Sequence, residues 1–411
     1  MTSPIFVLGG YQTDFARAFA REGLDISHMM REAIVGALTA SGVDASEIQT
    51  IHVGNAFSEL QRQQGHLGAM AAQVVPELWG KPAMRHEGAC ASSSLAILSA
   101  MSELEAGRYD IALVVGVEEQ KAIPGDQSSI NQNAAAWQGH EGISCTFMWP
   151  AVFGLLADEY NYRYGLDRQY LNRISEINYG NAKLNPLAQT REWKFTEASF
   201  TDDDVANPII EPGTRRQDCG QITDGAVALV LCSDRFIQTY AARSKKRVSE
   251  IARIRGWGHH NAGIKFLDKL DRSKDQPYVF PHVRDTITDA LHRAGIRNVM
   301  DLDAIETHDC FTATEYMAID HFGITAPGES WKAIESGLIE RGGALPMNPS
   351  GGLIGGGHPV GATGARMVFD AAKQVTGMAG DVQIDGAQNV ATLNIGGSLS
   401  TVASFVIGVG E

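Results

Sequence analysis

The sequence predicts an α/β protein built from two similar halves. Short apolar runs that favour strands alternate with helical patterns in the first third of the 411-residue chain, and the same order of elements returns after residue 250. The 44 glycines and the 44% hydrophobic content are typical of a large globular enzyme with many tight turns. A chain of this length can form two or more packed units, since domains usually hold roughly 100–200 residues.

The first half is predicted to open with a strand over residues 5–8 and a helix over 28–40. A strand over 48–53 and a helix after residue 90 follow. The run 110–116 is then apolar, rich in β-branched residues and ended by a glycine. Such a run is typical of a strand that is buried on both faces, so we expect a largely parallel sheet.

The segment from about residue 121 to 216 has a different character, because aromatic and polar residues dominate and turn signals interrupt it. Helical patterns remain over 152–164 and 168–183. We interpret this segment as an inserted, mostly surface subdomain within a first half that spans residues 1–250. A strand over 226–231 then resumes the sheet.

The second half, residues 251–411, repeats the order of elements without obvious residue identity. The expected strands and helices are, in order, the strand 251–257, the helix 283–294, the strand 304–307, the helices 311–322 and 362–375, and strands near 389–393 and 400–407. A duplicated α/β unit is therefore the economical interpretation.

Composition and charge exclude several classes of partner. Lys and Arg number 34 and Asp and Glu 48, so the formal charge of −14 argues against nucleic acid or an anionic membrane. The basic segment 243–247 is either a local anion-binding patch or a solvated helix end. No apolar stretch reaches the length of a membrane span, and neither an N-terminal leader nor a peroxisomal ending is recognised.

The cysteines indicate the cellular compartment, and the histidines indicate whether a metal site is expected. Five cysteines without a Cys-x-x-Cys pair suit a reducing compartment, so the cytoplasm is the expected location. The adjacent pair His259 and His260 has no carboxylates at ligand spacing, and no metal site is expected.

Cys90 is a candidate nucleophile because it stands between a Gly-Ala pair and a long apolar helical pattern. A thiol at a helix start faces unpaired backbone N–H groups and the positive end of the helix dipole, which favour the thiolate. The same N–H groups could hold a negatively charged oxygen. A lone cysteine in such a place is, however, more often simply buried than catalytic.

Three further segments support a catalytic role for Cys90. The glycine-rich run 348–364 places His358 directly before a proline and a helical pattern, and it lacks the spacing of a phosphate-binding loop. The run 306–311 contains His308, Asp309 and Cys310 at the end of a predicted strand, where catalytic groups of α/β sheets collect. The run 394–397 is a Gly-Gly turn between the last two strands, which alone indicates only a hairpin.

Together these segments resemble the thiolases over nearly the whole chain. The Cys90 helix start, the entry to the strand 226–231, the His-Asp-Cys-Phe segment, the Gly-His-Pro-x-Gly-Ala-x-Gly loop and the terminal Gly-Gly turn occur in the family's order. The resemblance implies a five-layer αβαβα sandwich of two similar halves with an inserted loop domain. It also implies reversible Claisen chemistry on coenzyme A thioesters, no permanently bound cofactor, and a homodimer or homotetramer.

The chain departs from the commonest thiolase pattern at two linked places. Most thiolases have Asn-Glu-Ala-Phe where this sequence has residues 308–311, and Cys-x-Gly where it has Asn394-Ile395-Gly396. This exchange of cysteines resembles the sterol-carrier-protein type of thiolase. A further departure is Gly256, which stands where many thiolases place a serine near the pantetheine arm.

The resemblance implies a role for each site residue. His358 activates Cys90, which forms an acyl-enzyme, and Cys310 exchanges the α-proton of a second thioester. The backbone N–H groups of Cys90 and Gly396 form one oxyanion site, and His358 with His308 forms the other. Asp309 is expected to orient its neighbours rather than to transfer protons.

Contacts to the substrate are less well defined by the sequence. Gly256 and Met148 are candidate coenzyme-binding positions, and Met148 and Trp149 either line the acyl pocket or belong to the ordinary core.

Three alternatives remain open at this point. A ketoacyl synthase-like condensing enzyme would use Cys-His-Asn or Cys-His-His, and Asn394 gives that interpretation slight support. A steroid side-chain retro-aldolase could share the fold, although it would not need the nucleophile that Cys90 supplies. A thiolase-like protein that only binds acyl-CoA is the third alternative.

Overall fold

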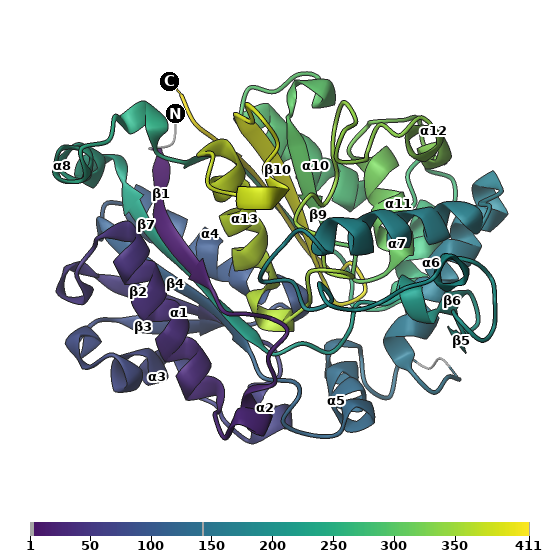
Figure 1. The fold of residues 1–411 in the computed structure, drawn as a ribbon, viewed down its shortest axis with the longest axis horizontal. Coiled ribbons are helices and arrows are strands. Elements are labelled where there is room, and N and C mark those ends of the chain that lie inside the picture. The colour runs from purple at the N-terminus through teal and green to yellow at the C-terminus, as the bar shows by residue number, and fades with distance from the viewer. Residues whose placement is uncertain (1–3, 142–143, 411) are drawn as a thin grey trace.

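The computed structural model describes residues 4–141 and 144–410, and in this part of the chain nine strands form one mixed sheet (Figure 1). The strands are, in chain order, β1 (Ile5–Gln12), β2 (Thr50–Gly54), β3 (Ala83–His86), β4 (Ile111–Glu118), β7 (Gly225–Ser233), β8 (Arg253–Asn261), β9 (Ala304–Thr307), β10 (Asn389–Gly396) and β11 (Thr401–Gly408). A small separate ribbon is formed by β5 (Ile209–Glu211) and β6 (Thr214–Arg215).

The expectation of a largely parallel sheet is wrong. Only β2 with β3, β2 with β4 and β9 with β10 pair in parallel, whereas β1, β7, β8 and β11 all have antiparallel neighbours. The apolar runs indicated burial on both faces, and the strands are indeed buried. Helical layers cover both faces of each half-sheet, so strands of either direction carry the same continuous apolar pattern.

The two halves of the sheet have the same topology. The first half has the strand order β3-β2-β4-β7-β1, and the second half, counted from its outer edge, has the order β9-β10-β11-β8. Each pairing in the second half has the direction of its counterpart in the first, and only a counterpart of β3 is missing among the described residues. The half-sheets meet where Ile5 and Phe6 pair with Ile254 and Arg253.

Helices form the remaining layers. Their bounds are α1 (Ile26–Ser41), α2 (Ser58–Arg62), α3 (Leu67–Val74), α4 (Ser92–Glu105), α5 (Gly125–Gln132), α6 (Met148–Tyr164), α7 (Gln169–Ala182), α8 (Asp234–Ser244), α9 (Phe266–Ser273), α10 (Pro281–Arg293), α11 (Thr312–His321), α12 (Ser330–Glu335) and α13 (Thr363–Val375). α1 packs on β1 and β7, and α10 packs on β8 and β11. α4 and α13 contact each other between the two half-sheets, which completes the predicted five layers (Figure 1).

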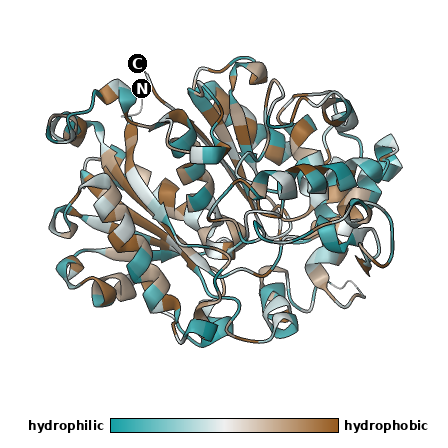
Figure 2. Cartoon of the chain, viewed as in Figure 1, coloured by the Kyte–Doolittle hydropathy of each residue, from teal (hydrophilic) through white to brown (hydrophobic). Residues whose placement is uncertain are grey.

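The middle layer is largely apolar, although α13 also carries the buried polar residues Arg366, Asp370 and Gln374. One buried cluster joins residues of α4 and α13 to inward-facing residues of the strands above and below them. Figure 2 shows hydrophobic residues on the central strands and the helices against them, and hydrophilic residues mostly on the outer helices and loops. A helix buried between two sheets has few ways to shift, so the residues that precede α4 and α13 are held firmly.

The predicted elements agree with the structure within four residues. α6 begins four residues before the predicted 152, and β1 and β8 end four residues after the predicted 8 and 257. The segment 121–216 contains α5, α6, α7 and the β5–β6 ribbon. The division at residue 250 and the bounds of the inserted subdomain stay predictions. Within the described residues, no helix combines the length and the apolar character needed to cross a bilayer.

Gly256 offers a test of the packing between β8 and α10. A Cβ atom at this position would lie 2.0 Å from the carbonyl oxygen of Ala290, so Gly256→Ala must push α10 away from the sheet. We expect a loss of about 1–3 kcal/mol in the free energy of unfolding, measured by urea denaturation. Gly125→Ala, where nothing lies within 4 Å, is the control and should stay within about 0.5 kcal/mol of the wild type. Equal stability of the two variants would contradict the described packing.

Candidate active site

Cys90 lies in a single turn of 3-10 helix, Ala89–Ala91, that leads directly into α4. Ala89 has a φ of 50°, a left-handed conformation that costs free energy for any residue with a side chain. Ser92 stabilises the turn, because its hydroxyl donates to the Ala89 carbonyl oxygen (2.6 Å) and accepts from the Gly88 amide (3.1 Å). The turn and the buried helix behind it therefore fix the direction of the Cys90 side chain.

The imidazole of His358 lies against this thiol, with Nε2 3.3 Å from Cys90 Sγ. On its other side, His358 Nδ1 lies 2.7 Å from Thr363 Oγ1. The Thr363 hydroxyl donates to the carbonyl oxygen of Pro359 (3.1 Å), so it accepts the proton of Nδ1. Nε2 then has a lone pair directed at the thiol, as a general base requires.

Burial sets the protonation of both groups. Desolvation raises the pKa of Cys90 to about 12, although the Gly397 backbone N–H, which is hydrogen-bonded to the sulfur, acts in the opposite direction. Desolvation, with the charge of Arg366, lowers the pKa of His358 to about 3. The predicted thiolate at the helix start is therefore wrong for the resting state, because burial outweighs the helix N–H groups. The pair rests as a neutral thiol and a neutral imidazole.

His308 is a second neutral imidazole in the site. It follows β9 and is fully buried, and burial holds its pKa well below the usual value. Its Nδ1 accepts from the backbone N–H of Ile395 (3.3 Å) and faces the side-chain amide of Asn394 (3.1 Å). Ser94 donates to Asn394 Oδ1 (2.7 Å), which leaves the amide nitrogen of Asn394 to donate to His308. The proton of neutral His308 consequently resides on Nε2.

Cys310 follows His308 by two residues and is 7% exposed. Burial is the main cause that raises the pKa of its thiol well above the usual range, and the neighbouring Cys90 acts in the same direction. Cys90, Cys310 and His358 all line one cavity of about 70 Å³. The structure therefore brings together the two sulfur atoms and the imidazole that the sequence placed far apart.

Asp309 orients its neighbours, as the sequence predicted. Its carboxylate accepts from the backbone N–H groups of Leu353 and Ile354 and from the side-chain amide of Asn178. These bonds tie the segment that carries Cys310 to the glycine-rich loop that ends at His358.

The remaining predicted site residues lie around this cavity or away from it. Gly396 packs on the Cys90 turn, where an added Cβ would lie 2.1 Å from the Gly88 carbonyl oxygen, and it lines an adjoining cavity of about 360 Å³. Gly397, one residue later, lines the cavity with the two cysteines. Met148 is 8% exposed and belongs to the hydrophobic core, whereas its neighbour Trp149 lines the small cavity. Gly256 packs against α10, because close approach of the helix requires a residue without a Cβ.

Two site residues were missed by the sequence analysis. Thr363 and Gly397 both stand inside segments that were examined, but neither carries a signal of its own. Only the folded geometry shows that Thr363 faces His358 and that the Gly397 amide faces Cys90.

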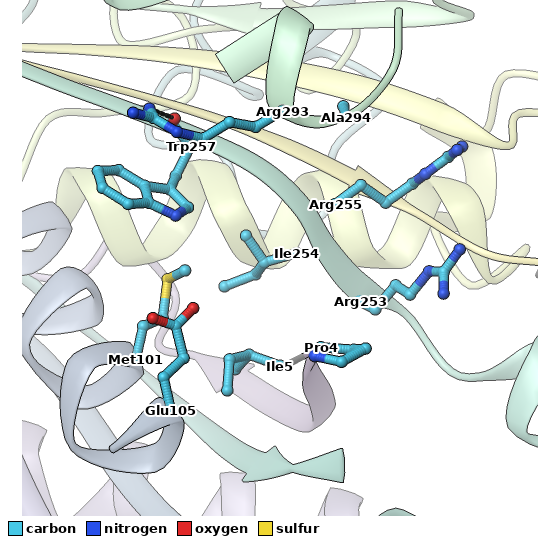
Figure 3. A pocket seen from close by; sticks show the side chains of 10 residues that line it. All are labelled: Pro4, Ile5, Met101, Glu105, Arg253, Ile254, Arg255, Trp257, Arg293 and Ala294. Carbon is cyan, nitrogen blue, oxygen red and sulfur yellow. Dashed lines mark hydrogen bonds between the residues drawn. The ribbon is translucent and has the colours of Figure 1, made fainter. Parts of the chain in front are cut away.

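A larger cavity of about 410 Å³ lies at the other end of α4, where Met101 and Glu105 line it with residues of β8 (Figure 3). Its arginines do not converge on one point. Arg253 and Arg255 point to one side, whereas Arg293 stacks over Trp257 on the other side, 4.0 Å from the ring centre (Figure 3). Its lining residues include one carboxylate, Glu105, but no thiol, hydroxyl or imidazole, so this cavity is not the candidate active site.

Cys90, His308 and His358 also form the one group among the described residues with the spacing of metal ligands, with all three ligand atoms within 4.8 Å of one another. A metal needs a lone pair from each ligand. The proton on His308 Nε2 occupies the position that such a bond would use, so this set of donors favours acid–base chemistry. The expected absence of a metal site stays a prediction.

The fold and the site define a class: layered, duplicated α/β proteins with a cysteine–histidine pair where the two halves meet. Family models agree with this class. The model of the thiolase N-terminal domain matches residues 5–199, and that of the thiolase C-terminal domain-like family matches residues 266–409.

Known proteins give the same result. An acetyl-CoA acetyltransferase of Methanothermobacter thermautotrophicus is 30% identical over 403 residues, which cover 98% of each chain. Sterol carrier protein 2 of Oryctolagus cuniculus is 25% identical over 99% of this chain and 72% of its own length. The solved structure of the Ltp2-ChsH2(DUF35) aldolase matches 99% of this chain and 98% of its own with a TM-score of 0.76 at 19% identity, which concerns the fold alone. The chain belongs to the thiolase family.

The raised pKa of Cys90 predicts its reactivity. Because the thiolate is the species that reacts with iodoacetamide, alkylation of Cys90 should rise about tenfold per pH unit from pH 7 and reach no plateau below pH 10. Peptide mass spectrometry at each pH measures the rate, with fully buried Cys232 as the internal control that stays unmodified. A plateau near neutral pH would contradict the resting state described above.

Proposed function

We propose that the protein is a thiolase-type acyltransferase, which catalyses reversible Claisen condensation or thiolysis of (3-keto)acyl-CoA through an acyl-enzyme on Cys90. The observation that carries the proposal is the 3.3 Å contact between His358 Nε2 and Cys90 Sγ inside the cavity that Cys310 also lines. Membership of the thiolase family and the similarity to an acetyl-CoA acetyltransferase support the same activity.

The first half-reaction uses the neutral Cys90–His358 pair. The thiol proton passes to His358 Nε2 as the sulfur attacks the thioester carbon, and a C–S bond to Cys90 replaces the C–S bond to coenzyme A. The leaving thiolate of coenzyme A takes the proton of Cys310. An imidazolium at His358 and a thiolate at Cys310 remain, and two opposite charges in a small buried cavity stabilise each other.

The second half-reaction uses this ion pair. The Cys310 thiolate removes the α-proton of a second thioester, and the high pKa of Cys310 makes it a strong base. The carbanion attacks the acyl carbon on Cys90, whose sulfur leaves and recovers its proton from His358. In the thiolysis direction the neutral Cys310 thiol protonates the departing enolate, so the resting protonation state suits cleavage.

Each step builds negative charge on a thioester oxygen, and the site contains donors for two oxyanions. We propose that the backbone N–H groups of Cys90 and Gly396 form one, together with that of Gly397, which is hydrogen-bonded to the Cys90 sulfur. His308, with its proton on Nε2, and protonated His358 supply the other; their rings lie 5.3 Å apart and nearly perpendicular. One good donor is typically worth about a hundred- to a thousandfold in rate.

A ketoacyl synthase-like enzyme is the second candidate, and the contact between Asn394 and His308 favours it. That chemistry needs no second thiol, however, and here Cys310 lies in the same cavity as Cys90.

The substrates we propose are coenzyme A thioesters, without a permanently bound cofactor. We further propose a homodimer or homotetramer in the cytoplasm.

Single-turnover acylation tests the function. Incubation with acetyl-CoA should add one acetyl group to Cys90, detected by intact and peptide mass, and Cys90→Ala should abolish the adduct. His358→Ala should slow its formation by about 10²–10⁴-fold, because the thiol then has no base. Thr39→Ala, on an exposed helix position of α1, is the control and should react as the wild type does. Absence of adduct with every acyl- and 3-ketoacyl-CoA ester, or an adduct on another cysteine, would overturn the proposal.

Asn394 is a positioning residue, since it acts through the tautomer of His308. In Asn394→Asp the carboxylate attracts the proton to His308 Nδ1, which removes the Nε2–H donor and should lower kcat about 10²–10³-fold at neutral pH. The new carboxylate also raises the pKa of His308, so activity should recover as the pH falls and both ring nitrogens are protonated.

The control for this variant is Thr39→Ala, on an exposed position of α1, which should leave kcat and its pH dependence unchanged. Steady-state kinetics from pH 5 to 9 measure both variants. A loss of activity in Asn394→Asp that is the same at every pH would mean that Asn394 is merely structural.

A further inference from the structure

The cavity that contains the two cysteines is small. Its volume is about 70 Å³, less than half that of an engineered apolar cavity of roughly 150 Å³ that holds benzene. An acyl group on Cys90 must fit this space together with the reacting carbon of the second substrate. The space therefore suits an acyl group of about two to four carbons and no aromatic ring.

Aromatic side chains form the walls and are held in place. Phe153 is 3% exposed and stacks on Phe311, with ring centres 4.7 Å apart. Trp149 lies beside Phe153, at 6.5 Å between ring centres, and its indole N–H donates to the backbone carbonyl oxygen of Gln132 (3.2 Å). A longer acyl chain has to displace one of these rings, which costs packing contacts and a hydrogen bond.

A second cavity, of about 360 Å³, adjoins this space. Phe57, Ala89, Ala135 and Gly397 line both cavities, so they lie where the two adjoin. The second cavity is also lined by the carboxylates Glu59 and Glu87. Phe57 is 4% exposed, so an acyl chain that widened this junction would displace a buried side chain.

Charge restricts the acyl group as well. No lysine, arginine, aspartate or glutamate is among the residues that line the 70 Å³ cavity. Its polar groups are the two thiols, His358 and Gln132, and His358 rests neutral. A carboxylate at the end of an acyl chain would lose its water here without gaining a cation, which is strongly unfavourable.

We propose that the acyl group transferred by Cys90 is short and uncharged, and that Trp149 and Phe153 set this limit. The proposal rests on the acyltransferase function proposed above. The two side chains act by excluding volume, and neither takes part in proton transfer.

The proposed limit on the acyl group can be tested by measuring acylation rates in single-turnover reactions, with intact mass spectrometry as the readout. The wild type should form an adduct with acetyl-CoA and butyryl-CoA, and at least about a hundredfold more slowly with decanoyl-CoA, benzoyl-CoA and succinyl-CoA. Equal rates with decanoyl-CoA and acetyl-CoA would overturn the proposal and leave the acyltransferase function standing. No adduct with any of the five esters would overturn the acyltransferase function itself.

Variants of Trp149 and Phe153 test whether these two side chains set the limit on the acyl group. Trp149→Ala and Phe153→Ala should each raise the ratio of the decanoyl rate to the acetyl rate about tenfold or more. The matched control is Trp331→Ala, because Trp331 is also partly buried but packs on Tyr170, away from the cavity. An unchanged ratio in both cavity variants, with circular dichroism showing that they are folded, would overturn the role of these residues. Succinyl-CoA should stay slow in both, because added volume supplies no cation.

Discussion

The structure depends on one contact, that between the Cys90 thiol and the His358 imidazole. Each group lies within five residues of the start of a helix of the middle layer, and α4 and α13 are counterparts in the two halves of the fold. Burial keeps both groups neutral at rest, which avoids two charges without solvent and still leaves a proton that can move along a 3.3 Å path. The proposed chemistry starts from this neutral pair.

A buried polar network holds this contact in place. Glu306, at β9, accepts from the backbone and the hydroxyl of Ser350 at the start of the glycine-rich loop. Arg366, on α13, donates to Ser350 (2.8 Å) and to Asp370 (2.7 Å). The loop is therefore anchored to a strand and to a helix as well as to Asp309. Removing one partner would leave a buried charge uncompensated, which is why such networks tolerate change poorly.

Apolar periodicity, a local signal, could predict the α/β class and the duplication. The layers and the roles of the cysteines and histidines are implied by the resemblance to the thiolases, which rests on short motifs. The sequence could not predict strand direction, since burial on both faces leaves the same apolar run in parallel and antiparallel strands. Nor could it predict the pKa of Cys90, where desolvation by distant segments outweighs the adjacent helix start. That the Gly397 amide faces Cys90 depends on the path of a single turn, and the packing of Gly256 depends on contact with Ala290, 34 residues later in the chain.

The equivalence of α4 and α13 has a consequence for the behaviour of the whole molecule. Neither half contains both Cys90 and His358, so the site forms only when the two unequal halves pack together. The contact between Cys90 and His358 therefore depends on how accurately the two halves are aligned. A change far from the sulfur, at the short β1–β8 pairing for instance, would move Cys90 relative to His358 by a rigid-body shift of one half, while every individual residue keeps its local geometry.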